Sequence, residues 1–153
     1  MSAVAEVFRN PVLLSALTAW GLAQIIKLPL EVVLKRKWNW AILLSTGGMP
    51  SSHAALVTSA AVGIGMAAGF DSPLFALAGA VAMVVLYDAT GIRRQAGQHA
   101  AIINQMIDDL VHGHPLKESK ELKEVLGHTP GEVAGGILFG IAIAVPMMKL
   151  LAR

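Results

Sequence analysis

Residues Val133–Met148 read VAGGILFGIAIAVPMM and contain no Asp, Glu, Lys or Arg. About 20 mostly apolar residues are needed to cross a bilayer as an α-helix, so this stretch and its apolar flanks predict a membrane span. Further stretches also lack charge, and they are Pro11–Ile26, Trp38–Phe70 and Ser72–Tyr87. We therefore expect an integral membrane protein with about four spans.

The composition of the whole chain also favours a membrane protein. Charged residues make up 14% of the 153 residues, whereas a soluble domain typically has about 25%. The length suits one domain, which we expect to cover residues 1–153. The chain has no cysteine, which excludes disulfides and thiol chemistry. No basic stripe interleaved with aromatic residues is present, so we expect no nucleic-acid partner.

The order of these stretches predicts an all-α helical bundle. We expect helices at about 11–34, 51–68, 73–110 and 132–151. The second half of the third helix is polar and should project into water. The segment 39–49 is too short to span, so we expect a re-entrant or interfacial segment before the Pro-Ser-Ser-His motif, buried in protein or lining a wet cavity. A polar loop should follow from residue 112 to residue 124.

The distribution of Lys and Arg predicts how the bundle is oriented. One side of the membrane would hold Lys35, Arg36, Lys37, Arg93, Arg94, Lys117, Lys120 and Lys123, and the other only Arg9, Lys149 and Arg153. Cytoplasmic loops carry an excess of Lys and Arg. We therefore expect an inner or plasma membrane protein whose polar residues of interest face the cytoplasm.

A possible phosphate site precedes the second helix, where residues Gly47–His53 read GGMPSSH. The first turn of a helix has unpaired N–H groups, and its dipole favours an anion. Ser51 and Ser52 add hydroxyl donors, and Gly48 allows the backbone to approach a ligand closely. The alternative interpretation is an ordinary N-cap before a membrane helix.

A second motif, GHTPGEV at Gly127–Val133, pairs a histidine with a carboxylate. His128 and Glu132 are four residues apart, so on one helical turn they would face each other. A carboxylate that holds one imidazole nitrogen fixes the tautomer and makes the other nitrogen a better nucleophile. The alternative is a solvated pair at the membrane interface.

Charged residues next to the apolar stretches are further candidates. Lys27 follows one such stretch, and a charge at membrane depth is costly and often functional, although a lysine can also snorkel to the interface. Asp88 follows another, and we expect it to hold a neighbouring cation rather than the substrate. The segment His112–His114 has two histidines but no nearby carboxylate or cysteine, so we expect no metal site.

The two motifs together carry a resemblance. Pro-Ser-Ser-His at Pro50–His53 resembles the Pro-Ser-Gly-His motif of the type 2 phosphatidic acid phosphatase superfamily, which includes vanadium haloperoxidases. His128–Val133 resembles the His-x-Pro-x-Asp-Val motif of that superfamily. Gly47–His53, Tyr87–Arg94 and Gly127–Val133 are more closely similar to a divergent branch of short membrane proteins. The resemblance covers residues from about 24 to 140.

The resemblance implies hydrolysis of a lipid phosphomonoester or diphosphate, with no metal and no cofactor. His128 would attack phosphorus and form a phosphohistidine, Glu132 would orient it, and His53 would protonate the leaving oxygen. Ser52 and nearby backbone amides would hold phosphate oxygens. Membrane lipids and the lipid phosphate substrate are the expected partners, and a homodimer is a further expectation.

Two parts of the superfamily pattern are absent. Lys27 is followed seven residues later by Leu34 rather than by Arg-Pro, and Glu121-Leu122 stands where a Ser-Arg pair would be. We therefore expect Arg93 and Arg94, with Lys27, to supply the positive charge. The alternative is a non-catalytic membrane protein that keeps a pocket for phosphate or a lipid headgroup.

Overall fold

The computed structural model describes residues 3–36, 38, 40, 47–111 and 127–151. These residues form six helices and no strand, which confirms the all-α prediction for the described part of the chain. The helices are α1 (Ala3–Val7), α2 (Pro11–Lys35), α3 (Ser52–Ala68), α4 (Pro73–Thr90), α5 (Ile92–Val111) and α6 (Pro130–Leu151). Residues 39 and 41–46 of the predicted segment 39–49, and the whole of the predicted loop 112–124, lie outside the described residues.

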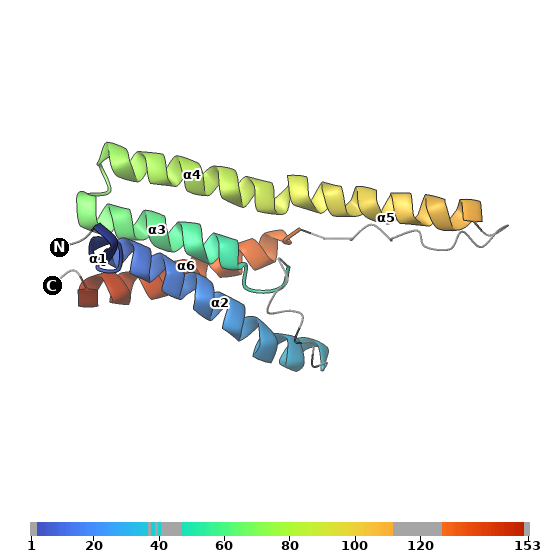
Figure 1. The fold of residues 1–153 in the computed structure, drawn as a ribbon, viewed down its shortest axis with the longest axis horizontal. Helices are drawn as coiled ribbons and strands as arrows, with labels where there is room; N and C mark the ends of the chain where they lie inside the picture. Colours follow the sequence, from blue (N-terminus) through green and yellow to red (C-terminus); the bar gives the residue numbers. More distant parts are fainter. Residues whose placement is uncertain (1–2, 37, 39, 41–46, 112–126, 152–153) are drawn as a thin grey trace.

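Several helices can cross a membrane. The runs that are long and apolar enough are Pro11–Val33, Pro73–Asn104 and Pro130–Leu151. Helix α3 is apolar but has 17 residues, the lower limit for a span of about 17–25 residues. Helix α1 and the end of α6 lie at the same end of the bundle (Figure 1). An even number of crossings by α2, α3, α4 and α6 accounts for that placement.

The predicted helix starts have local causes. The side chain of Asn10 accepts N–H bonds from Val12 and Leu13 at 3.0 and 3.1 Å, just before α2. Ser72 Oγ accepts the N–H of Phe75 at 3.2 Å and so caps α4. Each cap satisfies donors that a helix start would otherwise leave unpaired.

The predicted helix at 73–110 is divided. Helix α4 ends at Thr90, and Gly91 adopts φ −100° and ψ −83°, outside the helical range, before α5 begins. The change of direction is small, so α4 and α5 form one long rod that projects past the other helices (Figure 1). Helix α1 was not predicted.

Helix α3 is the centre of the bundle and packs against α2, α4 and α6. Its contact with α6 is close because α6 carries glycines there. A Cβ atom on Gly136 would lie 2.7 Å from Ala54 Cβ and would also strike the Ser51 carbonyl oxygen. A Cβ on Gly140 would lie 2.7 Å from the Ala55 carbonyl oxygen. Small residues thus let α3 and α6 approach, as is common for membrane helices.

Helix α2 completes the bundle through small residues and one polar contact. Ala19 and Ala23 of α2 pack with Ala55 of α3, and all three are fully buried. Ser15 Oγ and Ser59 Oγ form a buried hydrogen bond of 2.9 Å between the same two helices. Interhelical hydrogen bonds of this kind are worth about 0.6 kcal/mol on average in a membrane.

The glycine at the α3–α6 crossing gives a stability prediction. Replacing Gly136 with Val should lower the thermal unfolding temperature in detergent, because overpacking a tight contact typically costs about 1–3 kcal/mol. Gly21→Val is the matched control, since a Cβ at Gly21 meets nothing within 4 Å. Equal unfolding temperatures for the two variants would contradict this account of the crossing.

Candidate active site

The start of α6 forms a reciprocal cap that fixes Glu132. Thr129 Oγ1 accepts the N–H of Glu132 at 3.3 Å, and Glu132 Oε2 accepts the N–H of Thr129 at 3.1 Å. This is the capping-box arrangement of a Thr followed three residues later by a Glu. The glutamate is therefore positioned by the helix start itself, before any other part of the protein contributes.

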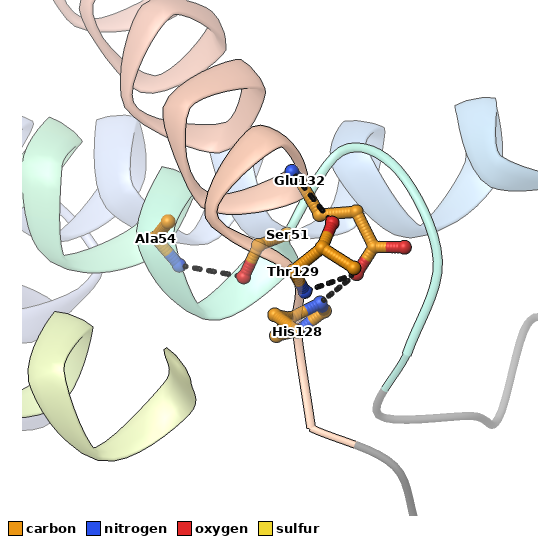
Figure 2. Close-up of polar contacts among 5 residues, drawn as sticks. All are labelled: Ser51, Ala54, His128, Thr129 and Glu132. Atoms are coloured by element: carbon orange, nitrogen blue, oxygen red, sulfur yellow. Dashed lines mark hydrogen bonds and ion pairs between the residues drawn. The ribbon is translucent and has the colours of Figure 1, made fainter. Parts of the chain in front are cut away.

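The same carboxylate oxygen also holds His128. His128 Nδ1 lies 3.1 Å from Glu132 Oε2 (Figure 2). Because the carboxylate accepts a hydrogen bond, it favours the tautomer with the proton on Nδ1 and leaves the lone pair on Nε2. The histidine is only 2% exposed and Glu132 is half-buried, so the histidine of this pair is shielded from water, unlike that of the solvated interface pair that the sequence left open.

Backbone hydrogen bonds attach this pair to two other helices. The N–H of His128 donates to the Ala89 carbonyl oxygen of α4 at 3.0 Å. The N–H of Ser51, just ahead of α3, donates to the Glu132 carbonyl oxygen at 2.9 Å. The site is thus built where the beginnings of α3 and α6 meet the end of α4.

The structure brings the two predicted histidines together. His53 lies in the first turn of α3, and its ring centroid is 6.1 Å from that of His128. The two rings meet edge to face, with an angle of 62° between their planes. His53 is half-buried. A small group placed at the start of α3 can therefore be near both imidazoles.

The two predicted serines lie at the start of the same helix, α3. Ser51 and Ser52 are both buried, with 0% and 2% of their surface exposed. Ser51 Oγ accepts the N–H of Ala54 at 3.3 Å, so it caps α3, as the alternative interpretation of the motif required (Figure 2). A hydroxyl that accepts one hydrogen bond still has a hydrogen to donate. Ser51 can combine capping with a contact to an anion.

Lys27 lies close to the pair although it comes from α2. It is 1% exposed and has a Coulombic interaction with Glu132. A lysine that snorkelled to the interface would have an exposed ammonium group, which differs from the position found here. The negative charge of the half-buried Glu132 compensates part of the cost of burying the Lys27 ammonium group.

A cavity of 280 Å³ opens beside Glu132. Residues that line it include Glu31 of α2, Gly48, Thr129 and Glu132. Gly48 has φ 89°, a left-handed conformation that favours glycine. Glu31 was not predicted as a site residue, although it stands four residues after Lys27 and therefore on the same helix face. An anion in this cavity would need cations to offset the two carboxylates.

The structure describes the remaining candidate site residues less completely. Asp88 is half-buried in the last turn of α4, next to Ala89. Arg93 and Arg94 begin α5, directly after the break at Gly91, and their side chains lie outside the described part. His112 and His114 also lie outside it. Among the described residues, no group of three or more His, Cys, Asp or Glu is placed to hold a metal ion.

Comparison with known proteins covers almost the whole chain. The profile described as "Divergent PAP2 family" matches residues 8–143, a range that includes every candidate residue from Lys27 to Glu132. A protein of Bacillus subtilis (strain 168) named "Uncharacterized membrane protein YuiD" is 41% identical over 148 residues, which cover 90% of this chain and 94% of that protein. No solved structure gives a significant match. Together with its apolar helices, these matches establish that the chain is a membrane protein belonging to the Divergent PAP2 family.

Proposed function

We propose that this protein hydrolyses a lipid phosphomonoester or diphosphate, without a metal ion, through a phosphohistidine on His128. The observation that carries the proposal is the part-buried hydrogen bond of 3.1 Å from His128 Nδ1 to Glu132, with His53 at a ring distance of 6.1 Å. A held imidazole next to a second imidazole supplies a nucleophile and a proton donor for phosphoryl transfer.

In the first step, Nε2 of His128 attacks phosphorus, and the bond from phosphorus to the leaving oxygen breaks. His53, in its protonated form, gives its proton to that oxygen, so the lipid alcohol leaves uncharged. A diphosphate substrate would release a lipid monophosphate in the same way. Glu132 stabilises the positive charge that develops on the His128 ring, as a carboxylate does beside a catalytic imidazole.

In the second step, a water molecule attacks the phosphohistidine. The now neutral His53 takes a proton from this water, the bond from nitrogen to phosphorus breaks, and inorganic phosphate leaves. His128 and His53 return to their starting forms. All protons and electron pairs are accounted for by the two histidines, the substrate and one water.

Phosphoryl transfer also needs positive charge around the phosphate oxygens. The N-terminus of α3 supplies a partial positive charge and the hydroxyl of Ser52. Lys27 supplies a full charge beside Glu132, and we propose that Arg93 and Arg94 supply the rest. Asp88, next to Ala89, would hold one of these cations. Phosphatidic acid, phosphatidylglycerophosphate and isoprenyl diphosphates all fit this chemistry.

We further propose that the site faces the cytoplasm. Arg36 ends α2, and Arg93 and Arg94 begin α5, all at the end of the bundle that carries His128. An excess of Lys and Arg favours the cytoplasmic side. The headgroup of a lipid in that leaflet would then meet the site while its chain stays in the bilayer.

One observation favours a second candidate function. Glu31 and Glu132 both line the 280 Å³ cavity, and the Ser-Arg pair of the wider superfamily is missing at Glu121-Leu122. A site with this charge could bind a lipid headgroup without cleaving it. The first experiment below separates the two functions.

Purified protein in detergent with EDTA should release phosphate from at least one lipid phosphate. His128→Ala should reduce that release by about a thousandfold or more, as loss of a nucleophile does in other enzymes. Rapid alkaline quenching followed by mass spectrometry should find phosphate on His128 of the wild type. Equal release by the variant, at equal thermal stability, would contradict the proposal, and no release from any lipid phosphate would favour headgroup binding.

The two roles of Glu132 can be separated by a pair of variants. Glu132→Gln keeps a capping box, because Gln serves as well as Glu there, but removes the charge beside His128, so kcat should fall about a hundredfold or more. Thr129→Ala keeps the carboxylate but removes a cap worth about 1 kcal/mol, so its main effect should be a lower unfolding temperature. Similar losses of kcat in both variants would mean that Glu132 acts only through the helix cap.

The proposal that Arg93 and Arg94 supply positive charge to the phosphate site is testable in the same assay. Replacing both Arg93 and Arg94 with Gln should lower kcat/KM by about a hundredfold or more, since an arginine on a transferring phosphoryl group can be worth about 10³-fold. Arg9→Gln, at the opposite end of the bundle, is the control for loss of surface charge. Full activity of the double variant would remove these arginines from the site.

A further inference from the structure

A groove runs between α4 and α6 and begins at the candidate active site. Thr90 and Pro130 line its near end, and Gly79 and Ile137 line its far end. Its volume of 530 Å³ lies within the range of small-molecule pockets, which is about 300–1,000 Å³. Helix α4 packs chiefly against α3 and contacts α6 little, which leaves room for the groove.

The near end of the groove lies next to His128, the proposed nucleophile. Pro130 comes two residues after His128, and Thr90 follows Ala89, whose carbonyl oxygen accepts the N–H of His128 at 3.0 Å. The groove therefore opens next to the position of a lipid phosphate held at His128. The cavity lined by Glu31 shares no lining residue with this groove and is lined by two carboxylates, those of Glu31 and Glu132.

The groove offers an apolar surface along its length. Val133 is buried in a cluster with Ala54 and Ala89, and Leu86 and Ile137 pack onto that cluster. Two lining residues carry a hydroxyl. That of Thr90 donates to the carbonyl oxygens of Leu86 and Tyr87 of its own helix, at 3.1 and 3.2 Å, and Tyr87 itself lies on the exposed rim. A hydroxyl bonded to its own helix presents mainly its methyl group to a neighbour. Hydrocarbon suits such a lining.

The dimensions match one lipid chain. From Thr90 to Gly79 the α4 backbone rises about 16 Å at 1.5 Å per residue. The hydrocarbon core of a bilayer is about 30 Å thick, so one leaflet is about 15 Å. Met83 and Tyr87 on the rim are 72% and 73% exposed, so the groove is open toward the bilayer. A chain could therefore enter sideways from the membrane.

We propose that the α4–α6 groove binds the hydrocarbon chain of the lipid phosphate while its phosphate lies at His128, and that Gly79 sets the limit of chain length. The inference rests on the proposed function and narrows its substrate class to lipid phosphates with a chain about one leaflet long. Gly79 has the right place for this role, because a Cβ there would meet nothing within 4 Å. A larger side chain at position 79 would fill the far end of the groove without disturbing the helix.

The test compares two alkyl phosphates that differ only in chain length, hexyl phosphate and hexadecyl phosphate. The wild type should prefer the long chain in kcat/KM. Gly79→Leu should lower the long-to-short ratio by about tenfold, the effect of removing two methylene groups from an apolar site. Gly21→Leu is the matched control, since Gly21 also has open space around its Cβ, and it should keep the wild-type ratio. An unchanged ratio in Gly79→Leu, with activity retained, would overturn the inference.

A binding measurement separates this inference from the proposed function. The probe is a hexadecyl phosphonate with a diazirine near the chain end, and its control is the same alkyl diazirine without the phosphonate. The phosphonate probe should label α4 and α6 peptides near Gly79 and Ile137, and Gly79→Leu should reduce this labelling. Equal labelling by the control would mean that ordinary bilayer chains fill the groove, and would overturn the inference. Phosphonate-dependent labelling without phosphate release from any substrate would refute the phosphatase but keep the groove as a lipid-phosphate site.

Discussion

The close approach of α6 to α3 is the constraint on which the rest of the site depends. Gly136 has no side chain, so the backbone of α6 can lie against Ser51 and Ala54. Only at this separation can the Ser51 N–H reach the Glu132 carbonyl oxygen at 2.9 Å. The same contact carries His53 to within 6.1 Å of His128. Helix packing in the membrane, rather than any loop, therefore sets the distance between the two histidines.

One carboxylate oxygen of Glu132 takes part both in the cap of α6 and in the hydrogen bond to His128. Its Oε2 accepts hydrogen bonds from the Thr129 backbone and from the His128 ring, so the group that starts α6 also sets the tautomer of the histidine. A carboxylate in this position is held by its own helix and needs no separate support. The Coulombic interaction with Lys27 ties α2 into the same group. The carboxylate of Glu132 is thus linked to His128, to Thr129 and to Lys27 of α2, and its backbone carbonyl oxygen is linked to Ser51 at the start of α3.

Local features of this fold could be predicted from the sequence. The caps at Asn10 and Ser72 and the spacing of His128 and Glu132 involve residues within one turn of each other, so sequence spacing describes them well. The hydrogen bond of His128 with Ala89 and the burial of Lys27 could not be derived in this way, because they depend on how the helices cross. The α4–α6 groove was missed for the same reason, whereas the four-residue spacing of Lys27 and Glu31 could have indicated Glu31. The break at Gly91 was also missed, since a lone glycine late in a helical pattern is compatible with a continuous helix.

The placement of the chain ends has a practical meaning. Helix α1 and the last turn of α6 lie at one end of the bundle, and the start of α6, which His128 directly precedes, lies away from that end (Figure 1). A reporter or an affinity domain fused to either end of the 153 residues would be separated from the histidines by about 30 Å of hydrocarbon. It would lie at the other end of the bundle from the two histidines. The protein can therefore be attached to a solid support through either chain end, and the end of the bundle with the two histidines then stays accessible to lipid.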